Sequence, residues 1–245
     1  MQVGQYCLID DVLYKIIEIN ELVKVKGIYI RIIRFVKKEE IVIIDDISKY
    51  KKENENLIKD LIKYNKRNYL TGKVLHIDSD SDYLQMSLDL YKRMNTYAKG
   101  ILLQESEIKD KIIDLIIEYN PDIIVLTGHD LYNNQGLSDL NNYMNTKYFI
   151  EAVKEIRKFY SKDDKLIIAG ACGSNFEALI ASGANFATSV KRVNIHLYDP
   201  VIIAIKSAFT PFNRIISLSN IFKHSIIKRE GIGGIETFGK MRMIL

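Results

Sequence analysis

The chain of 245 residues contains no tryptophan, three prolines and two cysteines. The scarcity of tryptophan and proline carries no functional information. Cys7 and Cys172 lie far apart in regions of different pattern, so no disulfide framework is expected and both thiols are expected to be reduced. This cysteine content fits a reducing compartment.

Long apolar runs and an excess of charge of one sign are also missing. The longest apolar stretches, such as residues 123–126, fall far short of the roughly 20 residues that cross a bilayer. The first residues contain no basic segment followed by an apolar run, so no secretory signal is expected. The net charge of +4, from 35 basic and 31 acidic residues, is spread along the chain and gives no argument for nucleic-acid binding. We therefore expect a cytoplasmic protein that does not insert into membranes.

The first 55 residues have the pattern of a small β domain. Short runs rich in Val, Ile and Tyr alternate with turn signals, which is typical of neighbouring strands. This predicts a small SH3-like β barrel over residues 1–55. Its basic residues form either a partner-binding surface or the solvated face of a half-buried sheet, and the second interpretation is favoured. They are Lys24, Lys26, Arg31 and Arg34.

A charged segment then opens a helix or linker over residues 57–69, which places a domain boundary near residue 55. Apolar side chains within this stretch have helical spacing. They are Leu57, Leu61 and Tyr64.

From residue 72 the pattern changes to strands that alternate with helices, which predicts parallel βαβ units with right-handed crossovers. We therefore expect an α/β domain over residues 72–245, built on a mostly parallel sheet with flanking helices. The expected strands are residues 73–77, 100–103, 123–126, 166–169 and 185–189. The expected helices are residues 83–98, 105–119, 145–160, 200–207 and 215–224, with a turn at residues 231–234.

Two reactive side chains follow neighbouring apolar strands of this pattern. Cys172 comes after the strand at residues 166–169, and His129 comes after the strand at residues 123–126. Because reactive groups in an open parallel sheet collect at the carboxyl ends of its strands, both are expected at one edge. A thiolate is a nucleophile, and a nearby histidine can take the thiol proton and give it to a leaving amine. The pattern therefore predicts a cysteine hydrolase with Cys172 as nucleophile and His129 as base and acid.

The residues around Cys172 support this interpretation. Gly170 and Gly173 allow a sharp turn and let a substrate carbonyl approach the amide of Cys172, which is a candidate oxyanion donor. Ser174 and Glu177 match a capping box, in which the Ser side chain bonds forward and the Glu reaches back. This would place Cys172 just ahead of a helix N-terminus, where the partial positive charge favours a thiolate.

The second oxyanion donor is less well defined. Gly-Ala-Cys-Gly with an upstream histidine is similar to the caspase arrangement, in which the histidine lies about 50 residues before the cysteine. Caspase-like peptidases generally place glycine directly after that histidine, whereas here Gly128 precedes His129 and Asp130 follows it. Gly128 and Asp130 are therefore both candidates. Asp130 either orients a histidine or caps the following loop, and the loop role is favoured.

Structural explanations compete with these assignments. A lone cysteine is more often a small buried hydrophobe than a nucleophile, and only its combination with glycines, a helix start and His129 favours catalysis. His196, near Asp199, is a second candidate base for Cys172, although capping and packing at a helix start are favoured for this pair.

Three acidic residues, Asp78, Asp80 and Asp82, follow the first expected strand of the α/β domain. They lack the glycine and distal glutamate of a calcium-binding EF-hand loop, and capping of the next helix explains at least one of them. If substrates are cut after a basic residue, Asp78 or Asp80 supplies the opposite charge in the specificity pocket. No group of His, Cys or acidic residues shows zinc-ligand spacing, so neither a metal nor a cofactor is expected.

Three runs of the chain resemble the YabG family of sporulation-specific proteases, and the resemblance extends over the whole chain. The runs are residues 126–130 (Leu-Thr-Gly-His-Asp), 168–187 (beginning Ile-Ala-Gly-Ala-Cys-Gly-Ser) and 192–196 (Arg-Val-Asn-Ile-His). Val190 stands where the family has proline, a departure that concerns a loop. The resemblance implies a caspase-like cysteine peptidase of spore-forming Firmicutes, made in the mother cell, that acts on spore coat and cortex-associated proteins.

The same resemblance assigns the nucleophile to Cys172 and the catalytic histidine to His129. It also implies cleavage at basic residues, particularly arginine, without choosing between Asp78 and Asp80. We therefore expect an endopeptidase that forms a thioester acyl-enzyme, acts in the mother-cell cytoplasm and associates with the spore coat. Its expected partners are spore coat and spore-assembly proteins as substrates, and self-association stays open.

Two other classes of function stay open as well. One is a noncatalytic assembly protein, whose barrel binds coat partners while the α/β domain is a scaffold. The other is a nucleotide or phosphate binder that uses residues 170–174 as an anion loop at a helix N-terminus. The absence of a Lys-Ser/Thr pair and of a full dinucleotide glycine pattern counts against the second class.

Overall fold

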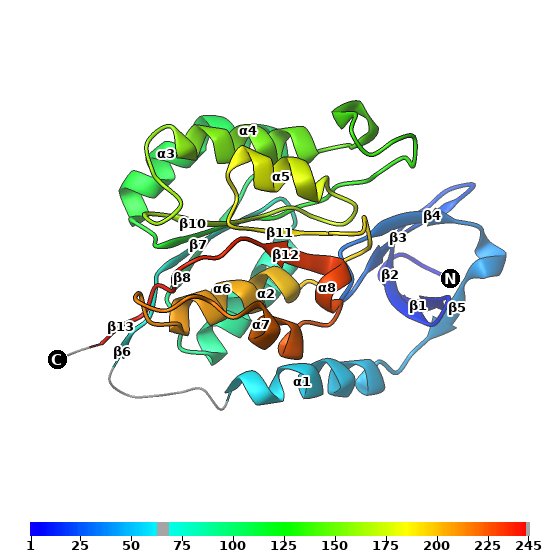
Figure 1. Ribbon diagram of the computed structural model, residues 1–245. Coiled ribbons are helices and arrows are strands. Elements are labelled where there is room, and N and C mark those ends of the chain that lie inside the picture. Colours follow the sequence, from blue (N-terminus) through cyan, green and yellow to red (C-terminus); the bar gives the residue numbers. More distant parts are fainter. Residues whose placement is uncertain (63–68, 244–245) are drawn as a thin grey trace.

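The computed structural model of the chain describes residues 1–62 and 69–243 (Figure 1). Within these residues the chain forms a five-stranded sheet, a six-stranded sheet and a two-stranded sheet. The five-stranded sheet comes from the N-terminal residues and lies beside the body that the six-stranded sheet forms with its helices (Figure 1). The α/β class is therefore confirmed. The two-stranded sheet pairs β6, Tyr69–Leu70, with β13, Arg242–Met243.

The N-terminal sheet is antiparallel, with the strand order β4-β3-β2-β1-β5. Val23 and Val25 of β3 are buried in its core, whereas Lys24 and Lys26 between and after them point to the other face. β4 and β5 are the two edge strands of this order, which is the order of an open sheet. The SH3-like barrel expected from the sequence therefore stays a prediction. The strands are β1 Tyr6–Ile9, β2 Val12–Ile19, β3 Val23–Gly27, β4 Ile33–Val36 and β5 Val42–Ile44, and the short helix η1, Lys38–Glu40, precedes β5.

Helix α1, Ser48–Ile62, follows the N-terminal sheet. It begins earlier than the helix expected at residues 57–69, and it runs through residue 55, where a domain boundary was expected. Ile58 of α1 is buried in the same hydrophobic cluster as residues of the six-stranded sheet. The division into two domains, residues 1–55 and 72–245, therefore stays a prediction. The side chain of Leu61 and all of Tyr64 lie outside the described residues.

The six-stranded sheet has the order β12-β11-β10-β9-β7-β8, and β12 is its antiparallel strand. The other neighbours pair in parallel, as the alternation of strands and helices predicted. The caspase-like arrangement of these elements stays a prediction. The strands are β7 Val74–Asp78, β8 Ala98–Leu102, β9 Ile123–Leu126, β10 Leu166–Ala169, β11 Phe186–Thr188 and β12 Ile232–Gly234.

The turn expected at residues 231–234 is wrong, because most of this segment forms the edge strand β12. Gly233 and Gly234 pair with Ala187 and Phe186 of β11. A Cβ atom on Gly234 would lie 2.3 Å from the Phe186 ring, so only glycine lets the two strands approach this closely. The glycines that resembled a turn signal therefore serve a close backbone contact.

Helices cover both faces of the six-stranded sheet (Figure 1). Ile123 and Val125 of β9 face one helical layer, whereas Ile124 and Leu126 face the other, as the alternation along a strand requires. No helix within residues 1–62 and 69–243 has the length and apolar character of a membrane span. One layer contains α2 Ser81–Arg93, α6 Asp199–Phe209 and α7 Leu218–His224, and the other contains α3 Ile108–Tyr119, α4 Thr146–Arg157 and α5 Phe176–Ser182. The shorter helices are η2 Glu105–Glu107, η3 Leu140–Asn142 and α8 Lys228–Gly231.

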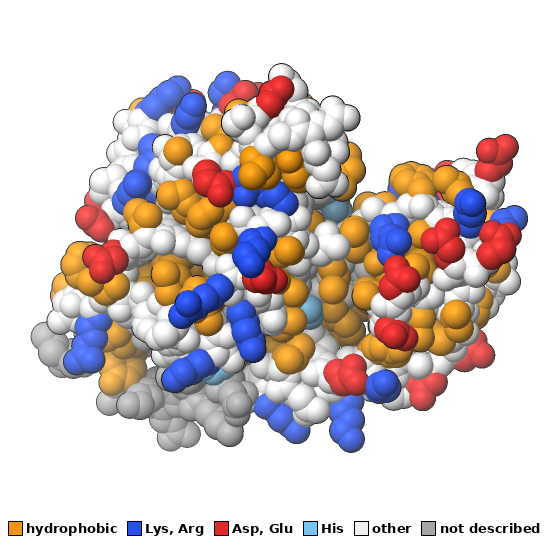
Figure 2. All heavy atoms as spheres, turned by 45° about the vertical axis from the view of Figure 1, so that its right-hand side comes forward, with side chains coloured by type: hydrophobic (Ala, Val, Ile, Leu, Met, Phe, Trp, Pro, Cys, Tyr) orange, Lys and Arg blue, Asp and Glu red, His pale blue; other side chains and the backbone are white. Residues whose placement is uncertain are grey.

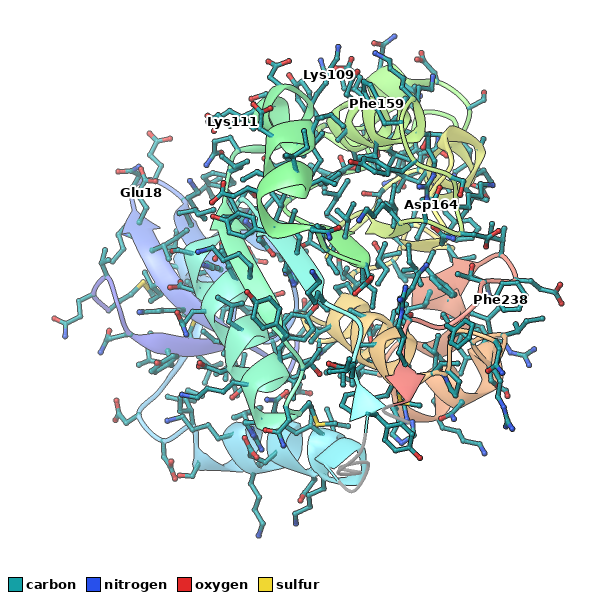
Figure 3. All side chains as sticks on the ribbon, turned by 90° about the vertical axis from the view of Figure 1, so that its left-hand side faces the viewer. Glu18, Lys109, Lys111, Phe159, Asp164 and Phe238 are labelled. Atoms are coloured by element: carbon teal, nitrogen blue, oxygen red, sulfur yellow. The ribbon has the colours of Figure 1, made fainter. Side chains whose placement is uncertain are left out.

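Helix α3 shows how the sequence produces one of these layers. Ile108, Ile112 and Ile116 recur at helical spacing, and all three are buried against the sheet. Lys109 and Lys111 lie on the outer side of the helix, where Figure 3 shows both side chains projecting away from the body. The period of the apolar residues therefore sets which face of α3 packs.

The carboxyl ends of β7, β9 and β10 meet at one edge of the six-stranded sheet, because these strands are parallel neighbours. The N-terminal sheet contacts this edge through the β3–β4 loop, residues 28–32, which hydrogen-bonds to residues 195–197. Figure 2 shows a furrow between the N-terminal sheet and the body, with histidine side chains visible in it. The expected site residues lie around this contact.

Ile112→Ala is expected to lower the free energy of unfolding by about 2–5 kcal/mol, because it leaves a cavity at a fully buried position. Ile117 of the same helix is 67% exposed, so Ile117→Ala is expected to change stability by less than about 0.5 kcal/mol. Urea unfolding followed by circular dichroism measures both. Similar losses for the two variants would contradict the packing of α3 described above.

Candidate functional site

Cys172 lies in the loop between β10 and α5. Gly170 and Gly173 adopt φ angles of +115° and +72°, a region that glycine enters without steric cost, so the chain turns sharply on both sides of the cysteine. Cys172 is only 4% exposed. Its Sγ accepts a hydrogen bond from the backbone N–H of Ile195 at 3.2 Å. The sharp turn was predicted, whereas the contact with Ile195 was not.

The thiol environment differs from the expected one in two respects. Burial raises the pKa of Cys172 to about 12, and a backbone hydrogen bond and the charge of Arg31 offset only part of this effect. The expected capping box is wrong, because Asn175, and not Ser174, caps α5 by accepting a hydrogen bond from the N–H of Ala178 at 3.1 Å. In this state the site holds Cys172 as a neutral thiol.

Asp130 joins the two loops that follow β9 and β10. Its carboxylate accepts hydrogen bonds from Ser174 Oγ at 2.8 Å and from the N–H of Asn145 at 2.7 Å. The hydroxyl of Thr146 and the N–H of Leu131 donate to the same carboxylate. These contacts agree with the loop role that the sequence favoured for this residue. Its role as an oxyanion donor stays a prediction.

His129 follows β9, and 25% of its side chain is exposed. Its Nε2 lies 3.1 Å from Oδ2 of Asp80, and its ring centroid lies 6.0 Å from that of Tyr83. Its backbone N–H donates a hydrogen bond to Oε1 of Glu105 at 2.6 Å. His129 and Cys172 follow neighbouring strands, as expected, but their side chains are not hydrogen-bonded to each other.

Gly128 has no space for a side chain. A Cβ atom at this position would lie 2.2 Å from Oε1 of Glu105. Its carbonyl oxygen accepts a hydrogen bond from Nη2 of Arg31 at 3.4 Å. The close approach of Glu105 explains why glycine precedes His129, and the role of Gly128 as an oxyanion donor stays a prediction.

Asp78 and Asp80, which the sequence did not distinguish, have different partners. Asp78 ends β7 and is fully buried. Its Oδ2 accepts hydrogen bonds from Nη2 of Arg31 at 2.5 Å and from Oγ1 of Thr127 at 2.7 Å. Burial alone would raise the pKa of Asp78, but the charge of Arg31 and the contacts of His76 and Thr127 hold it well below its usual range. Asp78 is therefore an ionised, buried carboxylate that already binds an arginine.

Asp80 lies at the start of α2 and faces both Lys26 and His129. Its Oδ1 accepts hydrogen bonds from Nζ of Lys26 at 2.6 Å and from the N–H of Tyr83 at 3.3 Å. Burial acts to raise the pKa of Asp80, but the hydrogen bonds of His129 and Lys26 lower it to about 2. The capping role expected for one of the acids falls to Asp80, together with a contact to His129 that the sequence did not predict.

The assignment of Lys26 and Arg31 to a solvated face is wrong. Arg31 is 1% exposed, and the Lys26 side chain is 14% exposed. Both are enclosed because the β3–β4 loop and the end of β3 pack against the carboxyl edge of the six-stranded sheet. Nothing in the local pattern distinguishes Arg31 from Arg34, which is partly exposed. Only the packing of the two sheets could have identified Arg31.

His196 and Asp199 have the structural contacts that the sequence favoured. His196 is 4% exposed, burial lowers its pKa to about 3, and its Nδ1 accepts a hydrogen bond from the N–H of Tyr198. Asp199 begins α6 beside Pro200 and accepts a hydrogen bond from Ser225 Oγ at 3.0 Å. Among the described residues, no three His, Cys, Asp or Glu side chains are placed to hold a metal ion.

Comparisons with known proteins match most of the chain. The profile of a family described as YabG peptidase U57 matches residues 37–245, a range that contains Cys172 and His129 but begins after Arg31. The chain is also similar to a Bacillus subtilis (strain 168) protein named sporulation-specific protease YabG, with 45% identity over 178 residues. The aligned region covers 71% of this chain and 61% of that relative, so the chain spans less than two thirds of the relative's length.

Asp130→Ala is expected to lower the free energy of unfolding by about 3 kcal/mol, because it leaves several enclosed donors without their charged acceptor. Asp139 is a matched control: it is exposed and caps η3 through one hydrogen bond, so Asp139→Ala is expected to cost about 1 kcal/mol or less. Chemical denaturation measures both losses. Equal small losses would show that Asp130 does not join the loops.

Proposed function

Because the chain belongs to the YabG peptidase U57 family, we propose that it is a sporulation-specific cysteine endopeptidase. Its substrates are spore coat and spore-assembly proteins, and it acts in the mother-cell cytoplasm in association with the spore coat. The name of the Bacillus subtilis relative supports the sporulation setting. The observation that carries the chemistry is the position of Cys172 and His129 after neighbouring parallel strands.

In the proposed reaction, His129 takes the thiol proton of Cys172, and the thiolate attacks the carbonyl carbon of the substrate peptide bond. His129 then gives the proton to the leaving amine, the C–N bond breaks, and a thioester forms on Sγ. Water, which loses a proton to His129, attacks the thioester and releases the carboxylate product and the thiol. Since the two side chains are not hydrogen-bonded here, they must approach each other before the first proton transfer.

Asp80 is proposed as the residue that orients the histidine. Its carboxylate contacts Nε2 of His129, which leaves Nδ1 for the thiol proton. Because the pKa of Asp80 is lowered to about 2, its carboxylate stays ionised at neutral pH and stabilises the imidazolium that forms during proton transfer. Asp80 is thus the proposed third member of the site, which the sequence left unnamed.

The oxyanion of the tetrahedral intermediate is proposed to bind the backbone N–H of Cys172. Such donors act best when they are fixed before the charge develops, as in a loop turned by two glycines. The second donor comes from Gly128 or Asp130. The N–H of His129 is a poor alternative, because it already donates to Glu105 at 2.6 Å.

Cleavage after arginine is proposed to depend on Asp78 and not on Asp80. A buried carboxylate recognises the planar guanidinium group, and the side chain of Thr127 and the N–H of Asp80 hold the Asp78 carboxylate in a fixed orientation. Asp80 is already engaged with Lys26 and His129. The bond between Asp78 and Arg31 supports the choice of arginine as the recognised side chain.

A noncatalytic assembly protein is the second candidate function. The observations that favour it are the burial of Cys172, its raised pKa and its lack of a hydrogen bond to His129. In this case the N-terminal sheet binds coat partners and the α/β part is a scaffold. The loss of proteolysis on changing the reactive residues separates the two functions.

Cys172→Ala and His129→Ala are each expected to reduce the processing of an arginine-containing spore coat protein by at least about a thousandfold, because each removes a reacting group. Cys7→Ala is the matched control, since Cys7 is buried in the core of the N-terminal sheet and is expected to leave processing unchanged. Mass spectrometry of the products measures the rates. Equal processing by all three variants and the wild type would end the peptidase proposal.

Asp80→Asn is expected to lower kcat about a hundredfold with little change in KM, because His129 loses the charge that orients it. Asp82→Asn is the control: Asp82 also bonds to Lys26, but 71% of its side chain is exposed. Steady-state kinetics on an arginyl peptide measures both parameters. A change confined to KM would assign Asp80 to substrate binding instead.

A further inference from the structure

The β3–β4 loop pairs in antiparallel fashion with residues 195–197, a segment that lies beside the carboxyl edge of the six-stranded sheet. The N–H of Arg31 donates to the carbonyl oxygen of Ile195 at 3.2 Å, and the N–H of Leu197 donates to the carbonyl oxygen of Tyr29 at 2.9 Å. The residues between them form an antiparallel bridge. Addition of an extended strand to a free backbone edge is a common way for proteins to bind peptides. Residues 195–197 therefore form an edge that can hold an extended peptide.

The side chain of Arg31 contacts the Asp78 carboxylate, the group proposed above to bind a substrate arginine. Its Nη2 bonds to Oδ2 of Asp78 at 2.5 Å and to the carbonyl oxygen of Gly128 at 3.4 Å. Its guanidinium carbon lies 4.7 Å from the centre of the Tyr83 ring, which forms a wall of the pocket. Arg31 thus lies between a carboxylate of opposite charge and an aromatic ring.

The loop also lies against the nucleophile. Ile195, whose carbonyl oxygen binds the N–H of Arg31, donates its own N–H to Sγ of Cys172 at 3.2 Å. The hydroxyl of Tyr83 lies within hydrogen-bond distance of two carbonyl oxygens, that of Gly27 at 2.6 Å and that of Ile30 at 3.0 Å, and so holds the beginning and the middle of the loop. Ile195 therefore contacts both the β3–β4 loop and the thiol of Cys172.

The hydrogen bonding of the Arg31 guanidinium group is incomplete. Nε and Nη1 of Arg31 are buried and have no hydrogen-bond partner among the described residues. A buried donor without a partner costs about 1–3 kcal/mol, and a buried ion pair repays its desolvation only when the geometry around both groups is complete. The contacts of Nη2 therefore offset only part of the cost of burying the Arg31 guanidinium group.

We propose that residues 29–31 are a tethered substrate mimic, which occupies the peptide-binding edge and the Asp78 pocket and blocks the site until the β3–β4 loop leaves. This proposal rests on the proposed peptidase function, since it names the occupant of the same site. Once the loop has left, the site would bind an extended peptide that has arginine at the position now occupied by Arg31.

The state of the thiol agrees with a blocked site. Cys172 is 4% exposed, and burial raises its pKa. Departure of the loop removes Tyr29 and Arg31, the two residues whose backbone groups now bind residues 195–197, and it admits water to this segment.

Arg31→Ala in the full chain tests the proposal, with Arg34→Ala as the matched control, because Arg34 pairs with the exposed Asp10 on the same N-terminal sheet. The first readout is the rate of Cys172 alkylation by iodoacetamide, followed by peptide mass mapping. Cys7, which is fully buried, is the internal reference for unfolding. The second readout is hydrolysis of a fluorogenic peptide amide that ends in arginine.

If the loop occupies the site in about nine molecules of ten, Arg31→Ala is expected to raise both rates about tenfold, since the competent fraction limits the apparent reactivity. Cys7 labelling and the rates of Arg34→Ala stay at the wild-type level. Tyr83→Phe, which removes the hydroxyl that fastens the loop but keeps the ring, is expected to act in the same direction with a smaller change.

The two readouts separate failure of this proposal from failure of the peptidase proposal. Faster alkylation without hydrolysis by any variant would support the covering loop and reject the peptidase. Equal alkylation and equal hydrolysis by wild type, Arg31→Ala and Tyr83→Phe would reject the covering loop and keep the peptidase. Slower hydrolysis by Arg31→Ala with Cys7 still protected would also overturn the proposal, because Arg31 would then assist the reaction.

Discussion

The ion pair between Arg31 and Asp78 constrains the whole carboxyl edge of the six-stranded sheet. Both residues are at most 1% exposed, so either charge left alone would be buried without a partner. Arg31 reaches Asp78 while its backbone lies along residues 195–197, which fixes where the N-terminal sheet docks. The carboxylate of Asp78 also accepts the N–H of Asp80 and so sets where α2 begins. One pair of charges thus relates two sheets, a helix start and the surroundings of the thiol.

Elements that depend on local chemistry were predictable from the sequence. Strands β9 and β10 coincide with the expected residues because a parallel strand buried on both faces is a short continuous apolar run between turn signals. Helix α6 begins where Pro200 allows a helix to begin. The ends of these strands in turn located Cys172 and His129, since side chains at the carboxyl ends of neighbouring parallel strands share an edge.

Contacts between distant parts of the chain were not predictable in the same way. Ser174 looks like a helix cap within its own segment, but its hydroxyl donates to Asp130, which lies 44 positions earlier. The pairing of Asp78 with Arg31 spans 47 positions, and that of Asp80 with Lys26 spans 54. Each of these bonds depends on how the two sheets pack. The acidic residues near the site could therefore be identified from the sequence, but the partner of each one could not.

The carboxylate of Asp130 has a consequence for the motions of the site. It is shared by the loop after β9, the loop after β10 and the start of α4. None of these segments can open by itself without breaking hydrogen bonds to a charged, enclosed group. They are therefore expected to open together, as one cooperative unit, and not to fray separately. Thermal fluctuations would then carry the backbones of Cys172 and His129 together, and the approach of their side chains would leave the spacing of the two loops unchanged.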